Sequence, residues 1–518
     1  MIQSTAVTAA PVRPRPLLWL YLLVLAGVLT VGAAAGGIVF TGYRPLAFAR
    51  ARALTSCSRQ YHVNPLVNLG TRQVADPAVS DRLLGFGRCI TSAERIRGFT
   101  MIGGAAAAVI LALVLMLLVS LADRWRLPRE FGQPIPGAHD RFTVLCQRHG
   151  VSGRRRPRLL IADRPVVEPR TIAMPGGRPL VVLPASVAIL YTDPARFDPF
   201  VTHELGHVLA KDVTWVSAVR GLVWLPIPVV LLASVPEFAV AGDTTAPLTA
   251  LTQCLLLAVI TAVFSAGLLR LRERQADRYA AAAVGTMPFV VALAAERRAS
   301  SGRDRWYRRV FASHPDPLAR VAALAKPDHA DDGGMVQGFA VGLLAAICMG
   351  GVSATVAALN TPSSGWLPGL AAAAVGAVVL GCGLTPSLHR RAEALSLGMG
   401  AGWWRPVAGV AGGLTAGVLV PLVNALPGTA AFPLPSSDLV TNLRDAVLVG
   451  AVGAAAVAVS VGLVTLAAGR SRRSVCAVAT ATAVLVTFTV LWPLSPVALP
   501  VRNCPELFTL PAVRVAPF

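Results

Sequence analysis

The chain has 518 residues, of which 54% are hydrophobic and only 14% are charged, and its mean hydropathy is +0.62. Soluble domains carry about 25% charged residues, so this composition excludes an ordinary soluble globular protein and indicates a membrane protein. The net charge is +21, but the arginines cluster at the ends of apolar runs. This placement fits attraction to anionic lipid headgroups, and we expect no nucleic-acid partner.

Nine apolar runs are long enough to cross a bilayer, since a span needs about 20 residues. They lie at 17–40, 99–122, 219–240, 248–269, 335–359, 366–384, 404–425, 445–468 and 475–499. A cleaved signal peptide is the alternative for the first run, although its apolar stretch is longer than is usual for one. We therefore predict a multi-pass protein of the plasma membrane, in contact with the lipid bilayer.

The arginines also predict an orientation. The basic segments 124–158 and 270–309 are expected in the cytoplasm, because positive loops stay on that side. The loop at 41–97 then lies outside, although it also holds arginines, which locally contradicts the rule. A disulfide between Cys57 and Cys89 is expected in this oxidising compartment, and two unpaired, apolar cysteines are the alternative.

These runs divide the chain into three expected parts. Residues 1–122 hold two spans and the outer loop, and 123–334 form a cytoplasmic domain interrupted by a membrane hairpin at 219–269. Residues 335–518 form a five-helix bundle with a tail, rich in small residues that let helices pack closely in lipid. The expected fold class is a mainly α integral membrane protein with about nine transmembrane helices and a small α+β domain on the cytoplasmic face.

The cytoplasmic domain opens with two predicted strands. Short aliphatic runs at 157–163 and 178–184 are bounded by Pro, Gly and Arg, and a turn signal lies between them at 173–177. Asp193 and Pro194 then predict the start of a helix, as its N-cap and its first residue.

That helix contains VTHELGHVLAKD at 201–212. His203 and His207 are four residues apart and share a helix face, so both imidazoles can bind one ion. Zinc takes such nitrogen ligands, and a catalytic zinc site has a third protein ligand. Glu204 points partly toward the same pocket, where it can accept a proton from the attacking water. Two solvated histidines on a polar helix are the alternative.

The segment GLLRLRERQADRYAAA at 267–282 offers the third ligand. Glu273 lies on a helix expected to emerge from the membrane, with Asp277 one turn later on the same face. Glu273 would complete the coordination of zinc, and Asp277 would accept a hydrogen bond from an imidazole N–H. A surface ladder of salt bridges between these acids and the neighbouring arginines is the alternative.

HELGH, a membrane hairpin and ExxAD, in this order, resemble the membrane-embedded zinc metallopeptidases of the HtpX-type heat-shock protease and CAAX prenyl endopeptidase family. LRLRERQAD resembles the family's SRxxExxAD, with Leu269 in place of the serine. TIAMPGGRPLVVL at 171–183 is similar to its Asn-Ala-aromatic-Ala-Leu-Pro-Gly-Gly segment, without the asparagine. SHPDPLAR at 313–320 is similar to its Ser-His-Pro-Pro segment, with Asp316 in place of the second proline. The resemblance covers about 120–325.

The resemblance implies a zincin-like metalloprotease domain of the gluzincin type, with one zinc ion per chain. It implies that His203, His207 and Glu273 bind the zinc and that Glu204 is the catalytic carboxylate.

Two further roles follow from the resemblance alone. It implies that His314 steadies the oxyanion and that Arg320 braces the neighbourhood of Asp277. For His314, which precedes Pro315, capping of a helix is the alternative.

The predicted strand at 178–184 has a further expected use. An extended substrate can pair with an exposed strand edge beside the metal, and such backbone pairing demands little of the substrate sequence. We expect this edge at Pro179, Leu180, Val181, Val182 and Leu183.

We therefore expect a zinc-dependent membrane metalloendopeptidase that hydrolyses membrane or membrane-proximal polypeptides, in protein quality control. A sensor or receptor is the alternative, in which the external loop or the C-terminal bundle controls regulatory proteolysis. A transporter-like bundle is disfavoured, because the C-terminal spans hold hardly any ionisable residue in mid-helix. The sequence carries no signal for an oligomeric state.

Overall fold

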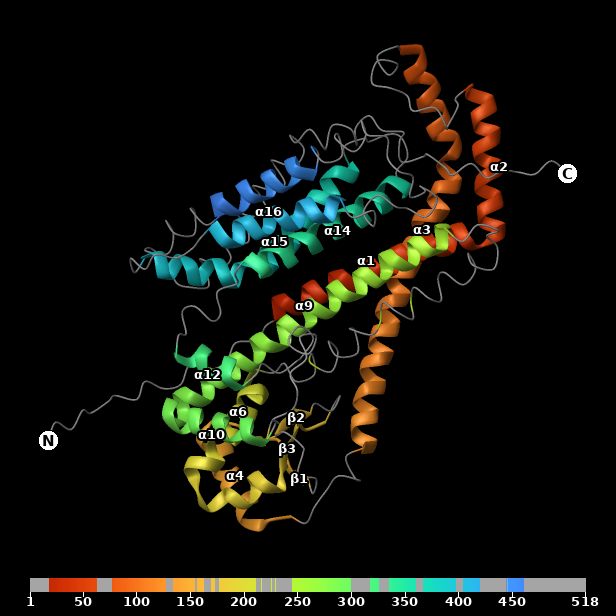
Figure 1. Cartoon of the computed structure of the whole chain (residues 1–518). Helices are drawn as coiled ribbons and strands as arrows, with labels where there is room; N and C mark the ends of the chain where they lie inside the picture. Colours follow the sequence, from red (N-terminus) through yellow and green to blue (C-terminus); the bar gives the residue numbers. More distant parts are fainter. Residues whose placement is uncertain are drawn as a thin grey trace. The chain divides into compact units, whose positions relative to one another are not determined.

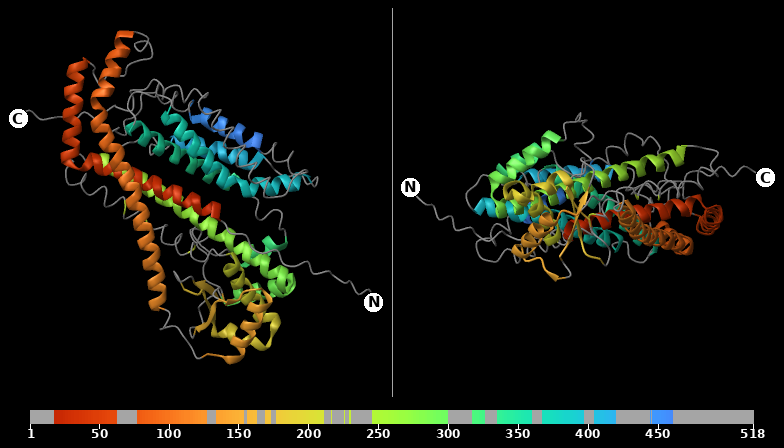
Figure 2. Two further views of the ribbon diagram at one scale, coloured as in Figure 1. Left: turned by 180° about the vertical axis from the view of Figure 1, so that it is seen from behind. Right: turned by 90° about the horizontal axis from the view of Figure 1, so that it is seen from below.

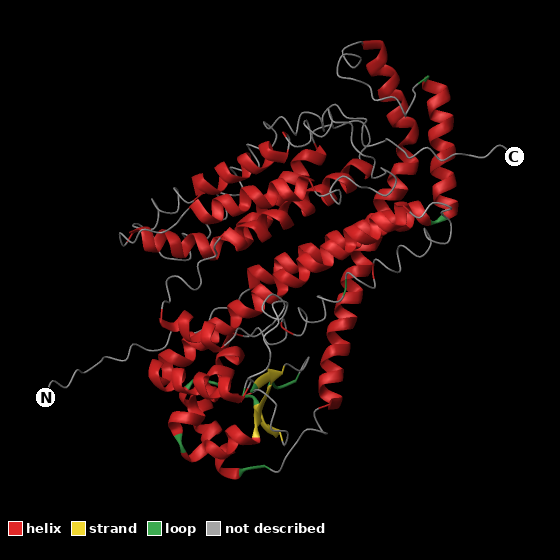
Figure 3. Ribbon diagram, viewed as in Figure 1, coloured by secondary structure: helices red, strands yellow, loops and turns green. Residues whose placement is uncertain are grey.

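The computed structural model describes most of the chain in separate segments. These are residues 18–62, 77–126, 134–153, 156–162, 169–172, 177–210, 245–299, 317–325, 335–359, 367–396, 404–419 and 446–460, and the single residues 216, 225, 229 and 444. Within them the protein is mainly helical, with three short strands (Figure 3). The chain forms two compact units, one made of 1–21, 112–223 and 262–331 and the other of 22–111, 224–261 and 332–518.

Four segments of the described helices are long and apolar enough to cross a membrane. They are Tyr21–Phe40 in α1 (Leu18–Gly42), Gly85–Ala122 in α3 (Pro77–Arg126), Gln337–Leu359 in α14 (Met335–Leu359) and Leu367–Leu384 in α15 (Leu367–Ser396). These four segments coincide with four of the nine predicted spans and indicate a multi-pass membrane protein. The predicted spans at 219–240 and 475–499 lie outside the described residues, except for residues 225 and 229.

The segment 41–97, predicted as a loop, is largely helical. Its first part is α2 (Arg44–Tyr61), and its last part is the beginning of α3, so the two helices form a hairpin (Figure 2). Apolar side chains at helical spacing are buried between them, and the predicted disulfide between Cys57 and Cys89 is confirmed. The prediction missed these helices because Arg and Ala dominate the segment, which makes the apolar stripe of α2 narrow.

Arg50 is one of the arginines that contradict the charge expected of an outer segment, and it is paired inside the hairpin. Glu94 of α3 accepts a hydrogen bond from Arg50 Nε at 2.9 Å and another from Arg97 Nη1 at 3.1 Å. All three side chains are buried. Arg50 is therefore an internal partner of the hairpin core, and it is not available at the surface.

Glycines bring α14 against α16 (Trp404–Leu419) in the C-terminal part of the chain (Figure 1). A Cβ atom on Gly338 would lie 2.5 Å from the carbonyl oxygen of Pro406, and one on Gly342 would lie 2.6 Å from that of Val410. The four-residue spacing puts both glycines on one helix face, so the backbones approach closely, as small residues allow in lipid.

The sheet lies in the first unit. Its strands are β1 (Arg158–Ala162), β2 (Arg170–Ile172) and β3 (Leu180–Pro184), in the order β1-β3-β2. The strand β3 pairs with β1 in parallel and with β2 in antiparallel orientation.

The predicted substrate edge at Pro179, Leu180, Val181, Val182 and Leu183 is therefore wrong. Leu180–Leu183 lie in the central strand, whose two edges are both occupied by hydrogen-bonded neighbours. Val181, Val182 and Leu183 are 0% exposed, as a strand covered on both faces requires. Among the described residues, β2 pairs on one side only and is the edge strand nearest the histidines' helix.

Helices cover one face of this sheet. They are α4 (Pro136–Arg148) and α6 (Pro194–Ala210), and α10 (Thr286–Ala299) and α12 (Pro317–Ala325) lie on the far side of α6 (Figure 1). Leu159 of β1 and Val181 of β3 pack with Phe142 of α4 and with Phe197 and Leu205 of α6. This core fixes α6 against the sheet.

Candidate metal centre

The helix α6 has one apolar and one polar face, and the polar face holds the predicted site. It begins where Asp193 and Pro194 predict, since Asp193 Oδ1 accepts a hydrogen bond from the backbone N–H of Ala195 at 3.1 Å. The apolar face packs on the sheet, so His203 and His207 point away from the sheet. Both are buried nonetheless, because other helices cover this side.

The helix α9 (Thr245–Val284) is one of these helices, and Gly206 permits its approach. A Cβ atom on Gly206 would lie 3.4 Å from Cα of Ala276. A larger side chain at position 206 would therefore meet the backbone of α9. Because Ala276 lies three residues after Glu273, this contact sets the distance between Glu273 and the histidines.

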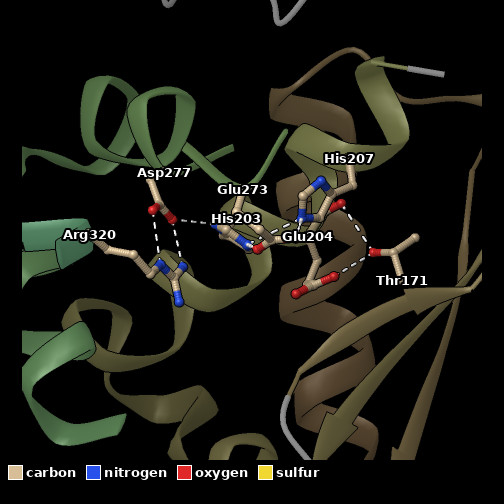
Figure 4. A network of polar contacts seen from close by, with 7 residues as sticks. All are labelled: Thr171, His203, Glu204, His207, Glu273, Asp277 and Arg320. Atoms are coloured by element: carbon tan, nitrogen blue, oxygen red, sulfur yellow. Dashed lines mark hydrogen bonds and ion pairs between the residues drawn. The ribbon is translucent and has the colours of Figure 1, made fainter. Parts of the chain in front are cut away.

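The three predicted ligands converge (Figure 4). Nε2 of His203 lies 3.2 Å from Nε2 of His207 and 3.3 Å from Oε2 of Glu273. Nε2 of His207 lies 3.5 Å from Oε1 of Glu273. The carboxylate of Glu273 thus faces the two imidazoles, as the metal-site prediction requires.

These distances fit a zinc ion. Four ligands held tetrahedrally at about 2.0–2.1 Å are about 3.3 Å from one another. The separations of 3.2–3.5 Å between the two imidazole nitrogens and the two oxygens of Glu273 are close to this value. Two imidazole nitrogens and one carboxylate oxygen are also a ligand set of catalytic zinc sites, which keep one further position for water or substrate. His203, His207 and Glu273 would therefore hold one zinc ion.

Asp277 orients the ring of His203 through the nitrogen that does not face the other ligands. Its Oδ1 lies 2.9 Å from Nδ1 of His203, which leaves Nε2 of the same ring for the metal. Arg320 of α12 donates to both oxygens of Asp277, from Nε at 2.9 Å and from Nη2 at 2.6 Å. Burial raises the pKa of Asp277, but the hydrogen bonds and charges of Arg320 and His203 together outweigh burial and bring the pKa below its ordinary value.

The environment of His203 favours a positive charge. Burial lowers the pKa of His203, yet the hydrogen bonds with Asp277 and Glu273 outweigh it and raise the pKa to about 10. A zinc ion supplies the positive charge in place of that proton, because only the neutral imidazole binds a metal. The ring of Phe289 in α10 stacks on His203, with the ring centroids 6.2 Å apart, and covers this side of the site.

Glu204 lies on the other side of the histidines, toward the edge strand β2. Its carboxylate is buried, and its Oε2 accepts a hydrogen bond from the Thr171 hydroxyl at 2.6 Å. Burial raises the pKa of Glu204, although His203 and the Thr171 hydrogen bond oppose this shift. A carboxylate with a raised pKa is a better proton acceptor, as a general base requires.

Two residues of this site were not predicted, and one predicted residue lies outside the described part of the chain. Thr171 and Phe289 escaped notice because their partners are far away in the sequence. The pairing of β2 with β3 is the signal that would have found Thr171, and no local pattern marks Phe289. His314 is outside the described residues.

Comparison with known protein families gives a match that includes this site. Residues 181–328 match Peptidase family M48, and this range includes both histidines, Glu204 and Glu273. No curated protein and no solved structure matches the chain. Residues 181–328 therefore carry a domain similar to Peptidase family M48, and its His203-His207-Glu273 group is the metal site of a zinc metalloendopeptidase. The apolar helices of the chain indicate that this peptidase domain belongs to a membrane protein.

Proposed function

We propose that the protein cleaves membrane or membrane-proximal polypeptides at the cytoplasmic face of the plasma membrane, in protein quality control. The observation that carries this proposal is the continuity of α9. This single helix includes the predicted span 248–269 and then Glu273. At 1.5 Å per residue, Glu273 is only about 6 Å along the helix from the end of that span. Polypeptides near the lipid surface can therefore reach the site.

The side chains of the site suit the hydrolysis of a peptide bond. When bound, zinc polarises the substrate carbonyl and lowers the pKa of a water molecule. Glu204 accepts the proton of the attacking water and delivers it to the leaving amine. His203 and His207 are held by their helix, and Asp277 keeps the ring of His203 in the required tautomer.

A substrate chain would pair with β2 in place of the predicted edge. Within the described residues this strand has a neighbour on one side only, and Thr171 on it contacts Glu204. A peptide added beside β2, on the side away from β3, would therefore lie close to the catalytic carboxylate. Pairing through the backbone tolerates varied side chains, which suits the clearance of unfolded segments.

The disulfide supports a cytoplasmic position of the domain. The helix α3 carries the chain from Cys89 through the apolar segment ending at Ala122 and then toward the domain. Disulfides persist in oxidising compartments, so the hairpin is extracytoplasmic and the domain is on the other side of this span. The arginines after residue 122 favour the same orientation.

A digestion experiment tests the proposed function. Purified protein should cleave an unfolded model polypeptide, and a zinc chelator should abolish the cleavage. Glu204→Gln should bind zinc as the wild type does and lose turnover. Cleavage that survives both the chelator and Glu204→Gln would show that another site is responsible.

A second candidate function is regulated proteolysis by a receptor. The observation that favours it is the hairpin of α2 and α3, a folded element with its own small core and a disulfide. Cleavage that rises with an external ligand would support the receptor. Cleavage that rises with misfolded membrane proteins would support quality control.

A further inference from the structure

The pairing of the strands determines where the side chain of Thr171 points. Thr171 of β2 lies opposite Val181 of β3 in an antiparallel pair. Directly opposite residues share a face of the sheet, and Val181 belongs to the core between the sheet and α6. Thr171 therefore faces α6, whereas its neighbour Ile172 packs on the opposite face, with Val182.

On this face the Thr171 hydroxyl meets Glu204 (Figure 4). Its Oγ1 lies 2.6 Å from Oε2 of Glu204 and 3.3 Å from the backbone oxygen of the same residue. A hydroxyl has one proton to donate, and the shorter contact to a carboxylate is the stronger one. Glu204 is only 2% exposed, and no other described residue donates a hydrogen bond to its carboxylate.

We propose that Thr171 is a positioning residue for the general base. Its hydroxyl holds Oε2 of Glu204, which leaves Oε1 as the oxygen that exchanges protons with water and with the leaving amine. The inference rests on the proposed hydrolysis, and it adds a residue that no motif of the sequence indicated.

The physical reason is the freedom of a glutamate side chain. A side chain with three rotatable bonds samples several rotamers, and a general base works only within hydrogen-bonding reach of the proton it takes. Small misplacements at such a site lower the rate strongly. Because Thr171 lies on the edge strand, the same strand that would bind the peptide also fixes the carboxylate.

Three variants of full-length protein test this role with a quenched fluorescent peptide as substrate. Thr171→Val keeps the shape and removes the hydroxyl, and Thr171→Ser keeps the hydroxyl and removes the methyl group. Thr202→Val is the matched control, because the buried Thr202 hydroxyl, on the same helix as Glu204, has no hydrogen-bond partner among the described residues. Zinc content is measured for every variant.

We expect Thr171→Val to bind one zinc ion and to lose about 10- to 100-fold in kcat, with KM changed by less than about threefold. Thr171→Ser should restore most of kcat, and Thr202→Val should match the wild type. A merely structural role of Thr171 would instead lower the folded fraction and leave kcat per zinc-loaded molecule unchanged. If the valine variant does not fold, Thr171→Ser and Thr171→Ala make the same comparison, since they differ only by the hydroxyl.

Two results overturn the assignment of Thr171. One is a Thr171→Val kcat within about twofold of the wild type, and the other is a Thr171→Ser variant as impaired as its hydroxyl-free counterpart. A wild-type protein that does not cleave the peptide overturns the proposed hydrolysis itself, and this inference with it. Chelator-sensitive wild-type cleavage separates the two kinds of failure.

Discussion

Gly206 and Ala276 bring the two metal-binding helices into contact, because a Cβ atom on Gly206 would lie 3.4 Å from Cα of Ala276. This distance is an ordinary van der Waals contact, so Gly206→Ala should keep one zinc ion per chain. Gly206→Leu should push α9 away and carry Glu273 out of reach of the histidines. Metal analysis of the purified variants measures this, and a leucine variant with full zinc content would refute the role of the contact.

The buried pair of Arg320 and Asp277 predicts a loss of stability. Asp277 is 2% exposed, and Arg320→Met leaves its carboxylate without the two hydrogen bonds of the guanidinium. An uncompensated buried charge costs about 3–5 kcal/mol, so the free energy of unfolding should fall by that amount. Chemical denaturation of the detergent-solubilised protein measures it.

The matched control for this prediction is an exposed ion pair of the same domain. Arg196 contacts Asp193 at 3.3 Å, but its side chain is 66% exposed. Such a pair contributes about 0–1 kcal/mol, so Arg196→Met should change little. Equal losses in the two variants would mean that burial does not decide the effect.

Helix packing in the C-terminal bundle can be tested with two neighbouring glycines. A Cβ atom on Gly413 would collide with the backbone oxygen of Phe339, whereas one on Gly412 would lie 3.6 Å from the ring of the same residue. Gly413→Ala should therefore destabilise the bundle by about 1–3 kcal/mol, and Gly412→Ala should be close to neutral. Thermal unfolding in detergent compares them, and similar melting temperatures would argue against the close approach of α14 and α16.

The half-buried His149 predicts how stability depends on pH. Burial and the nearby Arg148 lower the pKa of His149, although Asp198 opposes the shift, and His149 Nδ1 lies 2.7 Å from the hydroxyl of Tyr279. The unfolded chain takes up a proton there near pH 6.5, while the folded protein does so only at lower pH. The contribution of His149 to the free energy of unfolding is therefore lost as the pH falls below about 6.5.

The variant His149→Gln removes this titration. Between about pH 7.5 and about pH 5.5, its melting temperature should fall less than that of the wild type. The other titrating groups are common to both proteins and cancel in the comparison. If the melting temperature of the variant falls as much as that of the wild type or more, the pKa of His149 is not lowered in the folded protein.

Local patterns predicted the ligands and the helix that carries them. His203 and His207 share a face by spacing alone, and Asp193 and Pro194 mark the start of α6 because capping depends on adjacent residues. Glu273 was indicated by its place after a span together with the family resemblance. The helices of the segment 41–97 were not predicted, because the segment is rich in arginine and its apolar residues form only a narrow stripe on α2.

The arrangement of the strands could not be read from the same patterns. An aliphatic run such as 180–184 predicts a strand, but whether it is central or at an edge depends on partners elsewhere in the chain. The edge strand β2 has only three described residues, too few for an alternating pattern. The contact between Thr171 and Glu204 follows from that pairing, so it became visible only with the fold.

The convergence of His203, His207 and Glu273 on one ion is tested most directly by X-ray absorption at the zinc edge of the purified protein. We predict one zinc ion per chain, with two imidazole nitrogens and oxygen ligands at about 2.0–2.1 Å and no sulfur. Glu273→Gln should weaken zinc binding and alter the oxygen shell. A zinc-free protein, or a spectrum that lacks imidazole ligands or contains sulfur, would contradict this metal site.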